Sequence, residues 1–264
     1  MNRIKLFFNA YIHHSYHVAL MVLSYTGLSF ILWDMPIKKE TVLLPYFLAF
    51  MAYTGVKLFP FNRSLTLRRK GVIGLHFAAA IFLFLMLDFF RMGAVVVAFF
   101  LTVLYCVPLP FASKSWRYQP PLKILIVALC WGLLTVVFPW GVSMFTSVEG
   151  VLYFVQRVLL VFVAVLPFEI VDLHRDEAQL GTLPQRFGVL VTKKIGYWVV
   201  GLAVCLQLWL LFSAALPIYP ELLMSFLYAL FLWRSQPNRS PLFTLFWVEA
   251  VPLVGLLILI IFDA

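Results

Sequence analysis

Nine long apolar runs are the feature that most limits what this chain can fold into. An α-helix needs about 20 apolar residues to cross the hydrocarbon core of a bilayer. Runs of this order cover residues 15–33, 40–60, 71–90, 92–111, 122–146, 149–172, 194–216, 218–233 and 241–262. Charged residues make up 12% of the chain, about half of the share in a soluble domain. The sequence therefore predicts an all-α, polytopic membrane bundle of about nine transmembrane helices, folded as one domain over residues 1–264.

The basic residues gather at alternate ends of these runs. Fifteen of the twenty Lys and Arg residues lie at one set of ends, whereas the opposite ends hold only Lys38, Lys39 and Arg91. Cytoplasmic loops are enriched in Lys and Arg. We therefore expect a multi-pass integral membrane protein with a cytoplasmic N-terminus and the C-terminus on the opposite side, in the inner membrane if the source is a bacterium. The same bias explains the net charge of +9 without a nucleic-acid partner, and the lipid bilayer is the expected surrounding.

A cluster of acidic residues follows the sixth apolar run. Four of the eleven acidic residues lie within nine positions that begin at Glu169. Positions three and four apart share one face of a helix, so Glu169, Asp172 and Asp176 are predicted to form a carboxylate stripe. Such a cluster is costly to desolvate beside a membrane, and Mg²⁺ held together with substrate phosphates is a common reason for one. The alternative is a solvated helix end whose acids pair with Arg175 and Arg186.

The segment from Glu169 to Gly188 reads EIVDLHRDEAQLGTLPQRFG. It resembles the second aspartate-rich motif of UbiA-type intramembrane prenyltransferases, in which two aspartates four apart precede a Gly, a Thr-Leu-Pro-like turn and a closing Gly. Asp172 and Asp176 match the paired aspartates, and Glu169 matches the polar position before them. The resemblance implies a UbiA-like bundle in which Asp172, Asp176 and Glu169 bind Mg²⁺, with the two aspartates essential for catalysis.

A second, weaker similarity lies after the fourth apolar run. The stretch Tyr105–Pro110, followed by Lys114 and Arg117, is similar to the Tyr…Pro…Lys segment that the family carries at this place. The resemblance implies that Tyr105, Lys114 and Arg117, together with Arg175, bind the diphosphate of the substrate.

The first aspartate-rich motif of the family has no counterpart in this chain. The motif is expected near residue 54, where the segment 52–63 reads AYTGVKLFPFNR without an acidic residue. Lys57 is the basic residue within that segment's helical part, and an ammonium group is a compact charge that binds phosphate oxygens. We therefore hypothesise that Lys57 takes over a catalytic charge that the missing motif would supply through a metal ion.

The resemblance implies Mg²⁺-dependent transfer of an isoprenyl group from an isoprenyl diphosphate to a lipophilic or aromatic acceptor. Metal and basic side chains would stabilise the charge on the departing pyrophosphate. Two alternatives stay open. The first is a catalytically degenerate bundle that binds a prenyl lipid or a partner protein, which the missing motif favours. The second is a small transporter for an anionic lipid or metabolite.

Several polar residues lie outside these motifs. Arg157 falls within the sixth apolar run, where an ionisable residue is expected to pair or to serve a site. It is predicted to pair with Glu249, with recognition of the acceptor as the alternative. Glu221 is interpreted as a loop charge at the far end of the bundle. His17 is interpreted as an anchor at the membrane interface, with contact to the acceptor as its alternative.

Overall fold

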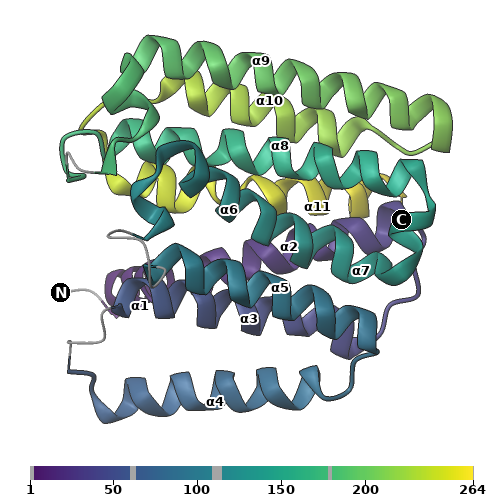
Figure 1. Ribbon diagram of the computed structural model, residues 1–264, viewed down its shortest axis with the longest axis horizontal. Coiled ribbons are helices and arrows are strands. Elements are labelled where there is room, and N and C mark those ends of the chain that lie inside the picture. Colours follow the sequence, from purple (N-terminus) through teal and green to yellow (C-terminus); the bar gives the residue numbers. More distant parts are fainter. Residues whose placement is uncertain (1–2, 60–63, 109–114, 178–179, 264) are drawn as a thin grey trace.

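The computed structural model describes residues 3–59, 64–108, 115–177 and 180–263, and every regular element in these ranges is helical (Figure 1). The α-helices are α1 Arg3–His13, α2 Tyr16–Leu32, α3 Lys39–Leu58, α4 Leu67–Phe84, α5 Phe89–Cys106, α6 Pro120–Gly132, α7 Phe138–Trp140, α8 Val148–Val171, α9 Leu183–Ala214, α10 Tyr219–Arg234 and α11 Val251–Asp263. Turns of 3-10 helix cover Trp116–Tyr118 and Gly141–Thr146, and π-helical stretches cover Leu133–Val137 and Phe243–Val248.

The helices coincide with the nine predicted apolar runs, so the prediction of an all-α membrane bundle is confirmed. Six segments within the described ranges are long and apolar enough to cross a membrane, and α2 is a shorter apolar helix. The six are Lys39–Leu58, Phe89–Cys106, Pro121–Thr146, Val148–Val171, Leu183–Ala214 and Phe243–Phe262. The protein is an integral, multi-pass membrane protein. Helix α1 was not predicted, because its 11 residues are too few for a span.

Long helices pack side by side and run up and down the bundle (Figure 1). Helix α8 packs on α6, α9 and α10, while α2 packs on α3 and α11. At one edge α4 packs mainly on α3, and α9 and α10 form the opposite edge (Figure 1). The N-terminal helix α1 and the C-terminal end of α8 lie at the same end of the bundle, whereas α11 ends at the other (Figure 1).

Close contact between helices depends on small residues at one crossing. A Cβ atom added at Gly196 of α9 would lie 2.3 Å from Leu232 Cδ2 of α10 and 2.8 Å from Leu166 Cδ1 of α8. Both leucines have no exposed surface. The missing side chain at Gly196 thus lets α9 approach α8 and α10, in the way that small residues allow close packing in membranes.

A buried ion pair joins α8 to α10 inside the apolar core. Arg157 Nη2 lies 3.1 Å from Glu221 Oε1, and the guanidinium carbon lies 3.8 Å from the centre of the Tyr25 ring. Gln156 Nε2 donates to Glu221 Oε2 at 2.6 Å. The predicted pairing of Arg157 with Glu249 is therefore wrong. Glu221 is no loop charge either: it is 4% exposed, because it lies in the first turn of a helix that packs directly on α8.

Candidate functional site

The predicted carboxylate stripe lies where α8 ends. Glu169 is in the last turn of the helix, Val171 is its last residue, and Asp172 caps it. Asp176 follows in a turn, and its backbone N–H donates to the carbonyl of Asp172 at 2.8 Å. The expectation of one continuous helical face is therefore wrong for Asp176. The turn nevertheless keeps both aspartates at the same end of α8, since a single i to i+4 hydrogen bond replaces the helix.

Glu169 is the buried member of the cluster, with 2% of its surface exposed. Its Oε2 accepts a hydrogen bond from Leu183 N–H at 3.1 Å, at the first residue of α9, where the helix dipole favours a negative charge. Lys123 of α6 places its Nζ 3.4 Å from Glu169 Oε1 and 3.9 Å from Asp176 Oδ2. The cluster therefore contains an internal cation. Lys123 is one of the fifteen basic residues at the expected cytoplasmic ends of the runs, and it was not predicted to join the carboxylates. Its position in the first turn of the run 122–146 was the available signal.

The Thr-Leu-Pro segment of the motif orders the turn that carries Asp176. Thr182 is the N-cap of α9, and its N–H donates to Gln185 Oε1 at 2.9 Å, as in a capping box. Gln185 Nε2 in turn donates to the backbone carbonyls of Asp176 and Glu177 at 3.4 and 3.3 Å. The closing Gly188 has φ 78°, a conformation that favours glycine, and it kinks α9 there. The motif thus has a local structural role.

Asp172 is the most exposed of the three carboxylates, with 38% of its side chain accessible. Its Oδ1 accepts a hydrogen bond from Arg175 Nη1 at 3.5 Å. Burial and the neighbouring Asp176 raise the pKa of Asp172, and Arg175 opposes that rise. An exposed ion pair of this kind contributes little to stability. Asp172 therefore remains accessible to a ligand.

The predicted diphosphate-binding residues are only partly brought together. Tyr105 lies at the end of α5, within electrostatic reach of Arg117, Glu169 and Asp176. Arg117 is exposed on the 3-10 turn that packs against α5 and α6. Lys114 lies outside the described residues. The structure therefore brings Tyr105 and Arg117 near the carboxylates.

Lys57 lies apart from the carboxylate cluster. It is in the last turn of α3, and its Nζ donates to the carbonyl of His13 at 3.3 Å and to Ser15 Oγ at 3.2 Å. His13 is the last residue of α1, and Ser15 lies in the turn that leads to α2. The described contacts of Lys57 are thus structural, and its catalytic role stays a prediction.

His17 lies in the interior of the bundle. It is 2% exposed, its Nδ1 is 2.9 Å from Tyr11 Oη, and its Nε2 is 3.1 Å from the carbonyl oxygen of Phe246. The ring also stacks on Phe246. The interpretation as an interface anchor is therefore wrong, because α1 folds over the start of α2 and covers it.

The donor set at the end of α8 decides how a metal ion could be held. No group of three or more His, Cys, Asp and Glu side chains among the described residues is arranged to hold a metal. Glu169 is engaged by Leu183, and Lys123 lies between Glu169 and Asp176. Asp172 and Asp176 remain partly exposed. Their oxygens fit Mg²⁺, which is usually held by one or two carboxylates together with substrate phosphates and water.

The comparisons with known proteins concern the fold. No protein-family model matches the chain, and no curated protein matches it either. Solved structures do. A UbiA homologue from Archaeoglobus fulgidus bound to Cd²⁺ has a TM-score of 0.65 and 15% identity, over 95% of this chain and 98% of that one. The same homologue bound to GPP and Mg²⁺ has a TM-score of 0.63 and 14% identity, over 96% and 98%.

A third solved structure concerns digeranylgeranylglyceryl phosphate synthase in membranes. Its TM-score is 0.57 at 15% identity, over 99% of this chain and 98% of that one. The similarity extends over almost the whole chain in each comparison. The protein therefore has the UbiA-type fold.

Proposed function

We propose that the protein is a membrane prenyltransferase that transfers an isoprenyl group from an isoprenyl diphosphate to a lipophilic or aromatic acceptor, with Mg²⁺ as cofactor. The observation that carries the proposal is the gathering of three carboxylates and Lys123 at the ends of α6 and α8. This cluster occurs in a fold shared with a UbiA homologue whose structure is bound to GPP and Mg²⁺.

In this proposal Asp172 and Asp176 hold the metal ion, since their carboxylates are the accessible ones. Bound Mg²⁺ would supply charge that stabilises the departing pyrophosphate. Glu169 has a positioning role: it holds Lys123 on one oxygen and the first N–H of α9 on the other. Lys123 then donates to phosphate oxygens, since its side chain is 14% exposed and its ammonium group has three donors.

The surrounding bases complete the proposed diphosphate site. Arg175 and Arg117 are exposed at the same end of the bundle, where a guanidinium binds phosphate oxygens in pairs. Tyr105 donates from its phenol, and Lys114 is assigned here by sequence alone. Lys57 is proposed to add positive charge from the end of α3, although its described hydrogen-bond partners are His13 and Ser15, at the junction of α1 and α2.

Pyrophosphate release from labelled geranylgeranyl diphosphate, in the presence of Mg²⁺, tests the proposal. Asp172→Asn and Asp176→Asn should each reduce the rate about 100-fold or more, because both remove charge that stabilises the transition state through the metal. Glu177→Gln is the matched control, since Glu177 is an exposed acid in the same segment outside the cluster, and its rate should stay near that of the wild type. Unchanged release in both aspartate variants would contradict the proposal.

A second candidate is a non-catalytic bundle that binds a prenyl diphosphate without ionising it. Two observations favour it: the segment 52–63 contains no acidic residue, and each carboxylate at the end of α8 already has a basic partner. Binding of the labelled diphosphate that saturates with Mg²⁺ present, with no pyrophosphate released over hours, would support this candidate over the enzyme.

The charge bias also leads us to propose that the carboxylate end of the bundle faces the cytoplasm. Helix α1 and the end of α8 share that end, whereas α11 ends at the opposite one (Figure 1). The N-terminus and the C-terminus should therefore lie on opposite sides of the membrane. A reporter protein fused to each terminus in turn tests this, and a C-terminal reporter that is active in the cytoplasm would contradict the orientation.

A further inference from the structure

A large cavity lies away from the carboxylate cluster, at the edge of the bundle. Its volume is about 740 Å³, and its walls come from α1, α2, α3, α4 and the segment just before α4. None of the carboxylates of the proposed active site lines it. A cavity of this size is large enough for a drug-sized ligand.

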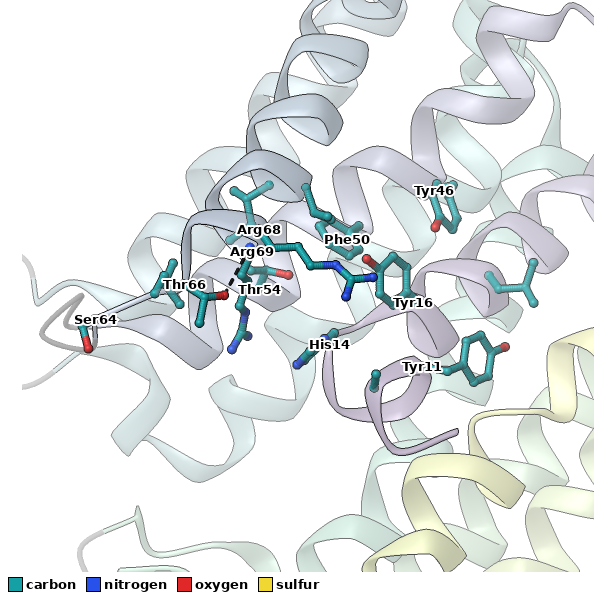
Figure 2. A pocket seen from close by; sticks show the side chains of 15 residues that line it. Tyr11, His14, Tyr16, Tyr46, Phe50, Thr54, Ser64, Thr66, Arg68 and Arg69 are labelled. Atoms are coloured by element: carbon teal, nitrogen blue, oxygen red, sulfur yellow. Dashed lines mark hydrogen bonds between the residues drawn. The ribbon is translucent and has the colours of Figure 1, made fainter. Parts of the chain in front are cut away.

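One end of the cavity is basic and hydroxylic. Ser64, Thr66, Arg68 and Arg69 lie there, with His14 facing them from the turn after α1 (Figure 2). Neither arginine forms a salt bridge with any carboxylate in the described part of the chain. Burial lowers the pKa of His14, and Arg69, His13 and Lys57 lower it further. Two guanidinium groups therefore lie at this end without an ion pair to a described carboxylate, and an anionic ligand would supply the opposite charge.

The other end of the cavity is apolar and aromatic. Tyr16 of α2 and Tyr46 and Phe50 of α3 lie there (Figure 2). The apolar residues Leu20, Val72 and Ile73 also line the cavity. One buried polar residue also lines the cavity: Thr54 is 4% exposed, and its Oγ1 is buried without a hydrogen-bond partner. A buried hydroxyl without a partner is costly.

The outer face of α4 shows what surrounds this cavity. Leu75, Phe77 and Phe82 are 69%, 54% and 60% exposed, which suits contact with lipid chains. Helix α4 is thus a single wall between the cavity and the bilayer. A ligand with one apolar chain and one anionic head would place each part against a wall of matching polarity.

We propose that this cavity binds an anionic phospholipid from the surrounding bilayer, with its phosphate at Arg68, Arg69 and His14 and one acyl chain along Phe50, Val72 and Ile73. No carboxylate lines the cavity, so the site needs no metal ion. The carboxylates of the proposed active site do not line it, so lipid binding can be measured apart from the enzyme activity.

Native mass spectrometry of the purified full-length protein tests the proposal, with phosphatidic acid and phosphatidylcholine of the same acyl chains as probes. Phosphatidic acid should bind about tenfold more tightly, also in the presence of a chelator. Arg68→Gln and Arg69→Gln should each weaken its binding about tenfold, since a charged hydrogen bond is lost. Lys70→Gln is the matched control: Lys70 lies in the same turn but does not line the cavity, and its loss should change binding less than twofold.

A second pair of variants tests the acyl chain. Val72→Trp fills the apolar end and should abolish retention of phosphatidic acid. Leu75→Trp adds the same bulk on the exposed face of α4 and should leave retention unchanged. Thermal unfolding in detergent verifies that each variant is folded.

Three outcomes would overturn the proposal. Equal losses in Arg69→Gln and Lys70→Gln would show attraction to surface charge alone. Displacement of the lipid by inorganic phosphate at matching concentrations would show a site for free phosphate. Loss of lipid binding in Asp172→Asn, or with the metal removed, would place the ligand at the carboxylate cluster.

Discussion

Removal of the Arg157 guanidinium should destabilise the fold more than removal of any exposed charge. Arg157→Met deletes the ion pair to Glu221 at 3.1 Å, a hydrogen bond to the Tyr25 carbonyl at 3.4 Å and the contact with the Tyr25 ring. Breaking a buried pair costs about 3–5 kcal/mol, because one charge remains buried alone. Glu221 keeps Gln156 at 2.6 Å and Tyr153 at 3.3 Å. We therefore expect Arg157→Met to lower the free energy of unfolding by about 3 kcal/mol, the lower end of that range.

Thermal unfolding of the purified protein in detergent measures this effect. A loss of about 3 kcal/mol corresponds to a fall in Tm of roughly 6–12 °C for a chain of this size. Arg175→Met is the control, since its side chain is 46% exposed in its ion pair, and it should change Tm by no more than about 2 °C.

The double variant tests the cause. Arg157→Met with Glu221→Leu removes both charges, and replacement of a buried pair by apolar residues is often close to neutral. The double variant should therefore unfold at a higher temperature than Arg157→Met alone. If its loss equals the sum of the two single losses, the two residues do not act as a pair and the reasoning is refuted.

Three further changes follow from the contacts described above. Lys123→Met should lower stability by about 2–4 kcal/mol in detergent unfolding, and Glu169→Gln should restore part of it, because the buried carboxylate is then neutral. Gly196→Ala should lower stability by about 1–2 kcal/mol through overpacking, whereas Gly201→Ala, with open space at its Cβ, should raise it by up to about 1 kcal/mol. Phosphatidylglycerol, whose single phosphodiester charge is constant over this range, should bind more tightly at about pH 5.5 than at about pH 8, because the depressed pKa of His14 rises when a phosphate stabilises the imidazolium; His14→Gln should flatten this profile.

The bundle itself was predictable because membrane spans obey a length rule. An apolar run of about 20 residues has few other folds open to it, and each run became a helix. What composition does not show is how a run is interrupted. The run 122–146 contains the π-helical stretch Leu133–Val137 and the short helix Phe138–Trp140, and these depend on packing. Helix α1 was not predicted because it packs on the start of α2 and does not cross the membrane, so the length rule does not apply to it.

The site was predictable only as far as its residues are close in sequence. Glu169, Asp172 and Asp176 lie within eight positions, so a helix and one turn suffice to gather them. Lys123 joins them from a different helix, and no spacing rule relates the two. The predicted partner of Arg157 was wrong for the same reason. Which distant acidic residue pairs with Arg157 depends on which helix packs against α8.

In the described part of the chain, helix α4 packs mainly on α3, and this affects how a lipid would enter the cavity at the edge of the protein. A lipid that enters laterally from the bilayer needs to separate α4 from α3, and the other helices of the bundle keep their packing. The rate of lipid exchange between the cavity and the bilayer is then limited by opening of the α3–α4 contact. Amide hydrogens of α4 should accordingly exchange sooner than those of α2 and α8, since segments with few packing partners open at low free energy.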